Sequence, residues 1–449
     1  MSSILLHNGT IVTGAIEAVG SILVTEGRIA DVLYSESDGY AEKIAEIKER
    51  NAGLEVWDLT GLHVMAGGID PHVHFREPGL THKADMHTES MAAAAGGITT
   101  AFDMPNTSPA TVDAAALRNK ISLASEKSVI RLGFHIGATN SNIDAIERLV
   151  TYGDEGAGIR PEDIAGVKVF MGSSTGNMLV DDRIALERLF SIKARPVLVH
   201  CEDESTIKAN LQAAIEKYGD DIPFSEHEHI RSRSACIRSS IRALEMAMRC
   251  GTRLVLCHIS TKEEIEMARA AKMTNPDIIT ETSCNYLWFC NEAYDRLGSR
   301  AKCNPSIKTA EDRTALREGL MNGTIDIIGS DHAPHLETEK DGIYTKAPSG
   351  MPSIQHTLPI LLTIAHQEDI PLTRIASVFS EKASEIYGLM SGKIKYGYAA
   401  DLVIFDKDKE FIVRKEDLLG KCGWSPYEGE TLKGKIEKVL VKGEIVCNS

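Results

Sequence analysis

The sequence has 449 residues, of which 43% are hydrophobic and 25% are charged, a composition typical of globular proteins. Its formal net charge of −15 argues against nucleic acid as a partner, because binding phosphates requires clustered Lys and Arg. No apolar run reaches the ~18 residues that span a bilayer, and the first residues lack the features of a signal peptide, so we expect no membrane partner. The nine cysteines are scattered without a CxxC pair, which indicates reduced thiols and a cytoplasmic location.

Both ends of the chain are predicted to be rich in short strands. Near the start, strand-like segments lie at residues 4–6, 10–12, 21–25 and 28–33. Tight turns are expected between them at Asn8-Gly9 and at Glu26-Gly27. Strand patterns return near the C-terminus. We therefore expect one small β-sandwich built from residues 1–66 and 388–449, with residues 67–387 inserted between its two parts.

The central residues repeat a pattern of strand followed by helix. Apolar segments end near residues 74, 103, 138, 170, 199, 257, 282 and 329. Helix-like segments follow most of them, at residues 113–128, 142–152, 181–193, 261–273 and 311–321. Eight buried strands that alternate with helices predict an α/β fold, a (β/α)₈ TIM-like barrel, rather than a doubly wound sheet. The glycine pairs match neither GxGxxG nor a P-loop.

The end of the first barrel strand carries His72 and His74, with Arg76 two residues further on. Side chains alternate faces along an extended chain, so both imidazoles point the same way, roughly 7 Å apart along the strand. Two such imidazoles can share one metal ion. Arg76 has the same parity, and a cation beside a metal suggests an anionic substrate. For this motif alone, two half-buried core histidines are the alternative.

Metal-binding residue types recur at the ends of other strands. The fourth strand contains Lys168 within an apolar run, the fifth and sixth end in His200 and His258, and the eighth ends in Asp331. In a TIM barrel the active site lies at the C-terminal ends of the strands. A single histidine there is usually a hydrogen-bonded core residue, but four histidines and one aspartate at matched positions favour a metal site.

Lys168 is expected to be modified. A buried ammonium would repel two divalent cations. Addition of CO₂ to its amine gives a carbamate, an anion that could bridge two metals ~3.5–4 Å apart. The alternative is a lysine whose stem packs in the barrel while its head reaches polar groups at the rim.

Two other segments carry charged or titratable residues. The loop at residues 336–349 follows the eighth strand, and it is either a mobile lid over the site or a solvated loop. His227 and His229 are predicted to lie at the surface with no role in metal binding.

The chain resembles the amidohydrolase superfamily, and within it the cyclic amidohydrolases: dihydroorotases, hydantoinases and allantoinases. The closest resemblance is to dihydroorotases of the type that combines a barrel with a split β domain. It covers nearly the whole chain. It rests on three segments, which are Asp70 to Gly79 with its His-x-His-x-Arg-Glu-Pro-Gly pattern, Met104-Pro105-Asn106-Thr107, and Gly329 to His335.

The resemblance implies a site with two divalent metal ions, zinc being expected. Their ligands would be His72, His74, Lys168, His200, His258 and Asp331. Carboxylated Lys168 would bridge the two ions, and Asp331 would also transfer protons. The substrate's carboxylate would be held by Arg76, Asn106 and His335. Its ring would be contacted by Asn304 and by the backbone near Gly350.

The resemblance further implies the reversible cyclisation of N-carbamoyl-L-aspartate to (S)-dihydroorotate plus water, a step of de novo pyrimidine (UMP) biosynthesis. In the hydrolytic direction a hydroxide that bridges the two metals would attack the ring amide, with Asp331 as general acid and base. A homodimer is also implied.

Two other functions are open. Another cyclic amidohydrolase, acting on a hydantoin, a dihydropyrimidine or allantoin, would share the metals but would need no carboxylate clamp. A barrel that has lost catalysis and serves as an assembly partner should be missing ligands, whereas all six positions hold competent residues.

Overall fold

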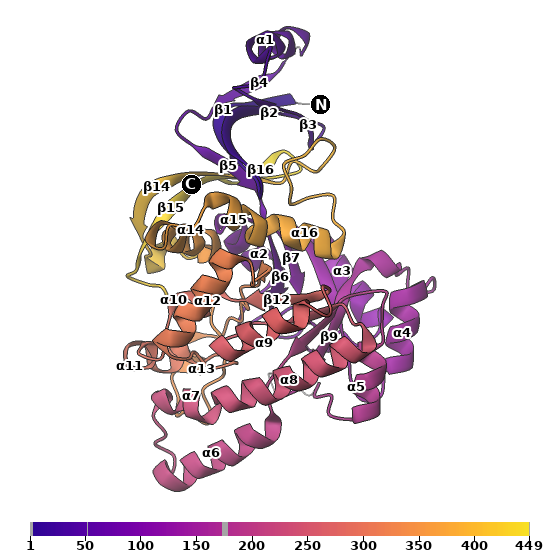
Figure 1. Ribbon diagram of the computed structural model, residues 1–449, viewed down its shortest axis with the longest axis vertical. Helices are drawn as coiled ribbons and strands as arrows, with labels where there is room; N and C mark the ends of the chain where they lie inside the picture. Colours follow the sequence, from indigo (N-terminus) through magenta and orange to yellow (C-terminus); the bar gives the residue numbers. More distant parts are fainter. Residues whose placement is uncertain (1–2, 52, 173–177, 449) are drawn as a thin grey trace.

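The computed structural model describes residues 3–51, 53–172 and 178–448, and its centre is a parallel eight-stranded barrel (Figure 1). Each strand pairs with the next in chain order. The strands are β6 (Gly68–Val73), β7 (Ile98–Asp103), β8 (Arg131–Gly137), β9 (Ile164–Phe170), β10 (Val197–His200), β11 (Leu254–Leu256), β12 (Ile278–Thr282) and β13 (Ile327–Ile328). Each ends within one residue of its predicted position, so the predicted barrel is confirmed.

The barrel is nearly closed between its first and last strands. Val73 forms a parallel bridge with His332, and the backbone N–H of His74 donates to the His332 carbonyl at 2.8 Å. The Asp70 carboxylate accepts from the backbone N–H groups of His72 and Ser330, both at 3.0 Å. These contacts hold the ends of β6 and β13 together at the carboxyl side of the barrel.

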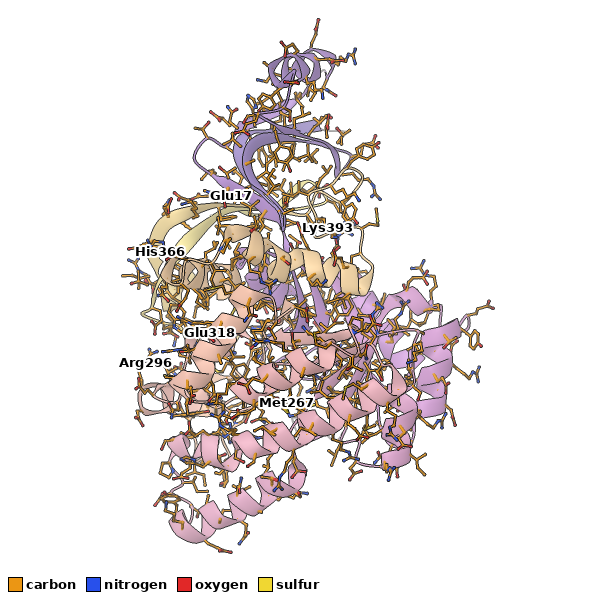
Figure 2. All side chains as sticks on the ribbon, viewed as in Figure 1. Glu17, Met267, Arg296, Glu318, His366 and Lys393 are labelled. Carbon is orange, nitrogen blue, oxygen red and sulfur yellow. The ribbon has the colours of Figure 1, made fainter. Side chains whose placement is uncertain are left out.

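Helices cover the outer face of the barrel and side chains fill its interior. Both faces of the strands are therefore buried, which explains their nearly continuous apolar sequences. They are α2 (Met86–Ala95), α3 (Ala114–Lys127), α4 (Ile143–Tyr152), α5 (Arg183–Phe190), α6 (Glu204–Tyr218), α7 (His227–Ile230), α8 (Arg233–Cys250), α9 (Lys262–Lys272), α10 (Cys284–Trp288), α11 (Ala293–Leu297), α12 (Ala310–Asn322), α13 (Glu337–Lys340), α14 (Thr357–Gln367), α15 (Leu372–Ala376) and α16 (Lys382–Tyr387). Capping side chains start several of them; Thr261 and Glu264, for example, form a capping box on α9. Polar residues such as Arg296, Glu318 and His366 are exposed on the outside of the helices (Figure 2).

Strands from both termini form one mixed sheet at one end of the barrel (Figure 1). Its order is β16-β15-β14-β5-β1-β2-β3, with β4 paired to β1. The N-terminal elements are β1 (Ser3–Val12), β2 (Glu17–Thr25), β3 (Arg28–Tyr34), α1 (Tyr40–Arg50), β4 (Glu55–Asp58) and β5 (His63–Ala66). The C-terminal strands are β14 (Leu402–Ile412), β15 (Thr431–Val441) and β16 (Glu444–Asn448). β5 ends at Ala66 and β6 begins at Gly68, next to the first predicted domain boundary. The division of the chain into domains at residues 66 and 388 stays a proposal.

The turn expected at Asn8-Gly9 is wrong. Both predicted segments belong to the single strand β1, whose pairing with β2 shifts register between Leu6 and Gly9. Asn8 has φ 61°, a backbone conformation that asparagine adopts more easily than most residues. The pair therefore forms an irregularity within a strand, not a hairpin. Among the helices of the described residues, none is both long enough and apolar enough to cross a membrane.

Candidate active site

The six residues predicted as metal ligands come together at the carboxyl end of the barrel. All six line one pocket, together with the predicted ring contacts Asn304 and Gly350 and with three residues that were not predicted, Phe170, Ala333 and Ser349. Each of the six predicted ligands comes from a barrel strand or from the loop directly after one. The fold therefore brings the six predicted side chains together, as expected for the ends of parallel strands.

On one side of the pocket, Asp331 lies beside the first two histidines. Its Oδ1 is 3.2 Å from Nε2 of His74 and 3.5 Å from Nε2 of His72. One ligand atom from each of the three residues lies within 4.8 Å of the others, close enough to hold a metal ion. Burial favours the neutral acid, but the neighbouring imidazoles outweigh burial and hold the pKa of Asp331 well below its ordinary value. Asp331 has φ 48°, a left-handed conformation that aspartate adopts more easily than most residues.

On the other side, His200 and His258 face each other. Nδ1 of His200 lies 3.0 Å from Nε2 of His258, and the His258 ring also lies against that of His72, with centroids 5.2 Å apart. Lys168 is fully buried, and its Nζ lies 3.3 Å from the Cys257 sulfur. Among the described residues, no carboxylate forms an ion pair with this ammonium.

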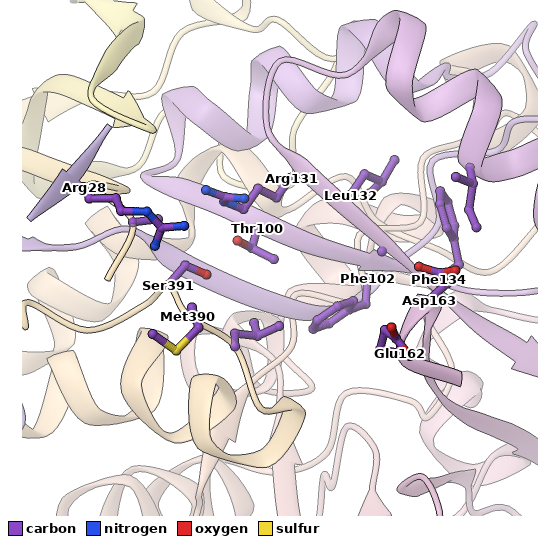
Figure 3. A pocket seen from close by; sticks show the side chains of 14 residues that line it. Arg28, Thr100, Phe102, Arg131, Leu132, Phe134, Glu162, Asp163, Met390 and Ser391 are labelled. Atoms are coloured by element: carbon purple, nitrogen blue, oxygen red, sulfur yellow. The ribbon is translucent and has the colours of Figure 1, made fainter. Parts of the chain in front are cut away.

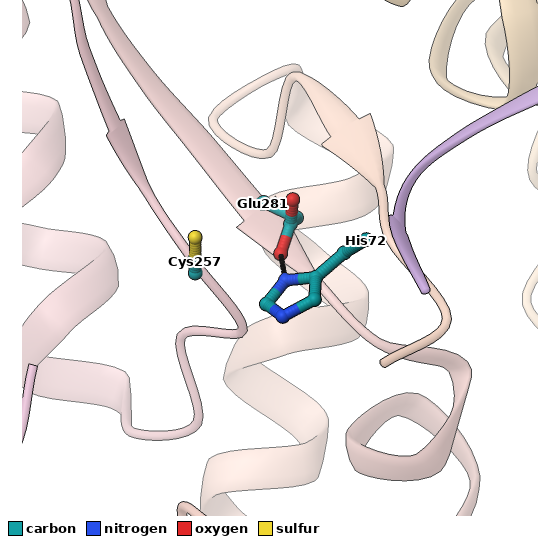
Figure 4. Close-up of side chains that lie close together, drawn as sticks. All are labelled: His72, Cys257 and Glu281. Atoms are coloured by element: carbon teal, nitrogen blue, oxygen red, sulfur yellow. Dashed lines mark hydrogen bonds and ion pairs between the residues drawn. The ribbon is translucent and has the colours of Figure 1, made fainter. Parts of the chain in front are cut away.

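Three of the four histidines are held through the ring nitrogen that faces away from the centre. Nδ1 of His72 donates to Glu281 at 2.7 Å (Figure 4), and Nδ1 of His74 donates to Oδ1 of Asn106 at 2.8 Å. Nε2 of His200 donates to Glu202 at 3.0 Å. Such bonds fix the tautomer and the orientation of a metal-binding imidazole. The Asn106 oxygen is thus used by His74, and Asn106 is not among the residues that line the pocket.

Glu281 and Glu202 are site residues that the sequence analysis missed. Both are fully buried. Burial raises the pKa of Glu281 to about 8, even though Lys168 and the His258 amide favour its ionised form. Burial also raises the pKa of Glu202, but Arg231 and His200 outweigh it and bring that pKa to about 2. A charged residue inside an apolar strand was the signal that found Lys168, and the same signal would have found Glu281.

Arg76 and His335, predicted to hold a carboxylate, lie next to each other behind the pocket. Arg76 is buried, its Nε donates to the Pro334 carbonyl at 3.1 Å, and its guanidinium lies 3.1 Å from Nε2 of His335. Burial lowers the pKa of Arg76 to about 10, so the guanidinium stays charged at neutral pH. Nζ of Lys83 lies 3.0 Å from Nδ1 of His335, and Nε2 of His335 also lies 3.1 Å from the Ser349 carbonyl.

The surface placement of His227 is wrong, whereas His229 is exposed as predicted. His227 is buried and bonds the Cys303 carbonyl at 2.7 Å and the Tyr344 hydroxyl at 2.8 Å. Its helix α7 spans only four residues, too few for a periodic pattern to show which side is buried. His227 therefore supports the segment before Asn304 and does not bind the centre.

A larger cavity, of about 380 Å³, lies elsewhere, between β7, β8 and residues 389–399 (Figure 3). Arg28 and Arg131 line one end and Glu162 the other. None of the predicted site residues lines it. Its Arg131 is already paired with Asp401 at 2.5 Å. We therefore place the active site in the smaller pocket, where the predicted ligands meet.

Known proteins resemble this chain along almost its full length. The model of the amidohydrolase family matches residues 63–446. A dihydroorotase from Methanosarcina acetivorans is 34% identical, with 93% of this chain and 88% of the relative covered. An allantoinase from Desulfitobacterium hafniense is 33% identical, with 95% and 94% covered. The solved structure of L-hydantoinase (dihydropyrimidinase) from Arthrobacter aurescens matches with a TM-score of 0.90 at 26% identity, covering 100% of this chain and 96% of the other. The chain therefore belongs to the amidohydrolase family of hydrolases.

Proposed function

We propose that this hydrolase is a dihydroorotase, which interconverts N-carbamoyl-L-aspartate and (S)-dihydroorotate plus water. The observation that carries the proposal is the buried guanidinium of Arg76. Within the described residues no carboxylate pairs with it, and its contacts are a backbone carbonyl and the imidazole of His335. A buried cation of this kind favours a substrate that brings its own negative charge. Dihydroorotate carries such a carboxylate on its ring, whereas hydantoin, dihydrouracil and allantoin do not.

The chemistry of the converging donors fits two divalent metal ions. His72, His74 and Asp331 would hold one ion, and His200 and His258 the other. Carboxylation of Lys168 would turn a buried ammonium among imidazoles into an anion able to join both sets of ligands. Imidazole and carboxylate donors accept zinc, the ion we expect, as well as manganese and cobalt. Bound metals would activate the attacking water and polarise the ring carbonyl.

Asp331 is suited to move the proton. Its low pKa keeps it ionised at neutral pH, and its carboxylate faces into the pocket beside the imidazoles. In the hydrolytic direction it takes a proton from the attacking water and gives it to the leaving ring nitrogen. In the biosynthetic direction the ureido nitrogen closes onto the side-chain carboxylate and water leaves. Ring closure consumes a proton, so a lower pH favours dihydroorotate.

The second candidate is another cyclic amidohydrolase, since an allantoinase is 33% identical to this chain and solved structures of an L-hydantoinase and of a dihydropyrimidinase match its fold. The test is to measure kcat/KM of the purified, metal-analysed protein on dihydroorotate, hydantoin, dihydrouracil and allantoin. We expect dihydroorotate to be preferred. A preference for any ring without a carboxylate would reject our proposal in favour of the second candidate.

We also propose that the protein is a cytoplasmic homodimer of the pyrimidine pathway. Sedimentation of the purified protein tests the dimer, and cell fractionation tests the location. A monomer or a membrane-associated protein would contradict these two expectations.

A further inference from the structure

The segment from Leu336 to Gly350 forms one wall of the pocket. It follows the last barrel strand, and its end lines the pocket through Ser349 and Gly350. The sequence left open whether it is a lid or a solvated loop. In the structure Lys340 of this segment is fully buried, whereas Lys346 is exposed. A lysine that is fully buried is rare unless its ammonium is paired, so its partners need to be identified.

The partners of Lys340 are three backbone carbonyls. Its Nζ donates to the carbonyl of Lys302 at 3.1 Å, to that of Pro348 at 2.9 Å and to that of Gly350 at 3.0 Å. An ammonium has three N–H donors and a neutral amine only two, so this geometry uses every donor of the charged form. Burial lowers the pKa of Lys340 to about 7, and the three carbonyl dipoles act in the opposite direction. The side chain thus joins two parts of the segment to the backbone of Lys302, two residues before Asn304.

A second lysine does the same from the other side. Nζ of Lys302 donates to the carbonyls of Tyr344 and Ala347, each at 2.6 Å. The backbone N–H of Gly350 donates back to the Lys302 carbonyl at 2.9 Å. Two residues after Lys302, Asn304 lines the pocket, and its buried Oδ1 has no hydrogen-bond partner within the described part of the chain. The two lysines therefore connect both ring contacts that the sequence predicted.

We propose that Lys340 and Lys302 are positioning residues that hold the backbone of Gly350 and the amide of Asn304 in place for the substrate ring. The segment at 336–350 is then a fixed wall of the pocket rather than a lid. An ordered wall lowers the entropy that substrate binding must cost. Releasing it should therefore weaken substrate binding more than it slows the chemical step. The identity of the ring rests on the proposed function, but the fixed wall does not.

The direct test is amide hydrogen exchange in residues 344–350 of the ligand-free protein, comparing Lys340→Met with the matched control Lys346→Met. Methionine keeps the length of the buried side chain but cannot donate. We expect exchange at the bonded amides of Ala347 and Gly350 to become about tenfold faster or more in Lys340→Met and to stay unchanged in the control. Lys302→Met removes two hydrogen bonds of a less buried side chain, so amide exchange should become faster by a smaller factor. This variant replaces Lys340→Met in the test if Lys340→Met does not fold.

A kinetic readout separates positioning from a general loss of structure. With whichever ring the wild type hydrolyses, we expect KM to rise about tenfold in Lys340→Met, with a smaller change in kcat and an unchanged metal content. Failure of the wild type on every cyclic amide would reject the proposed function, yet the exchange result would still decide on the fixed wall. Unchanged exchange in both lysine variants, with KM within about twofold of the wild type, overturns the proposal.

Discussion

The two sides of the pocket stabilise buried charge in different ways. On the side of the metal-binding residues, the ammonium of Lys168 has a thiol as its partner and is surrounded by imidazoles. On the opposite wall, every N–H donor of Lys340 reaches a backbone carbonyl. Backbone groups of the chain alone therefore satisfy the buried ammonium in this wall. The metal-binding side gathers donors around one point, which is the arrangement expected where a cation or a modified lysine completes the site.

The largest effect is expected from Asp331→Ala, which removes the proton-transfer group from the metal-binding side. Turnover should fall by about 10²- to 10⁴-fold or more, because general acid–base catalysis contributes that much. The fold should be retained, which circular dichroism can check. The exposed Asp341→Ala, on the wall side, is the control and should keep normal activity. Near-normal turnover in Asp331→Ala would reject the assigned role.

Arg76→Ala tests whether this buried guanidinium binds the substrate's carboxylate. If the buried guanidinium binds the substrate's carboxylate, the substitution should weaken binding of the transition state by roughly 2–5 kcal/mol. The loss is measured as a lower kcat/KM for dihydroorotate. Kinetics with hydantoin, which has no carboxylate, provide the internal control and should change little. A loss under ~0.5 kcal/mol on dihydroorotate would mean that Arg76 only packs against its neighbours.

Glu281→Gln tests whether the hydrogen bond between Glu281 and His72 supports metal binding. The change keeps the size of the side chain but replaces one oxygen of the carboxyl group that receives the His72 N–H with an amide N–H₂. Affinity for zinc should drop by about 10- to 100-fold, as is usual when the outer partner of a ligand histidine is altered. Equilibrium dialysis measures this, with the exposed Glu318→Gln as the matched control. Equal zinc affinity in the two variants would show that Glu281 only packs.

The smallest effect is expected for a charge outside the pocket. Lys393, at the protein surface (Figure 2), pairs with Glu385 at 2.7 Å. Lys393→Ala should lower the free energy of unfolding by less than ~1 kcal/mol, because solvent and salt screen such pairs. Urea unfolding tests this. A loss of several kcal/mol would mean that surface charges matter here as much as buried ones.

The sequence predicted what depends on local pattern. Strand ends followed from apolar runs, and the convergence of His72, His200 and Asp331 followed from the rule that parallel strands end at the same mouth of the barrel. Both expectations concern residues whose neighbours are fixed by the fold class. They required no knowledge of which side chains touch.

What the sequence could not predict depends on tertiary contacts. The carbonyl partners of Lys340 come from residues 302, 348 and 350, which only the folded chain brings together. The same holds for His227, whose burial depends on Tyr344. Asn106 was assigned to the substrate, but its oxygen also orients His74, a contact across two strand ends.

We propose that six converging side chains hold two metal ions, with a carboxylated lysine between them. The most direct measurement is native mass spectrometry of the purified protein and of Lys168→Met, combined with metal analysis. We expect two divalent ions per wild-type chain and the added mass of one CO₂, both lost or reduced in the variant. A wild-type chain with an unmodified Lys168 and no bound ion, yet fully active, would contradict it.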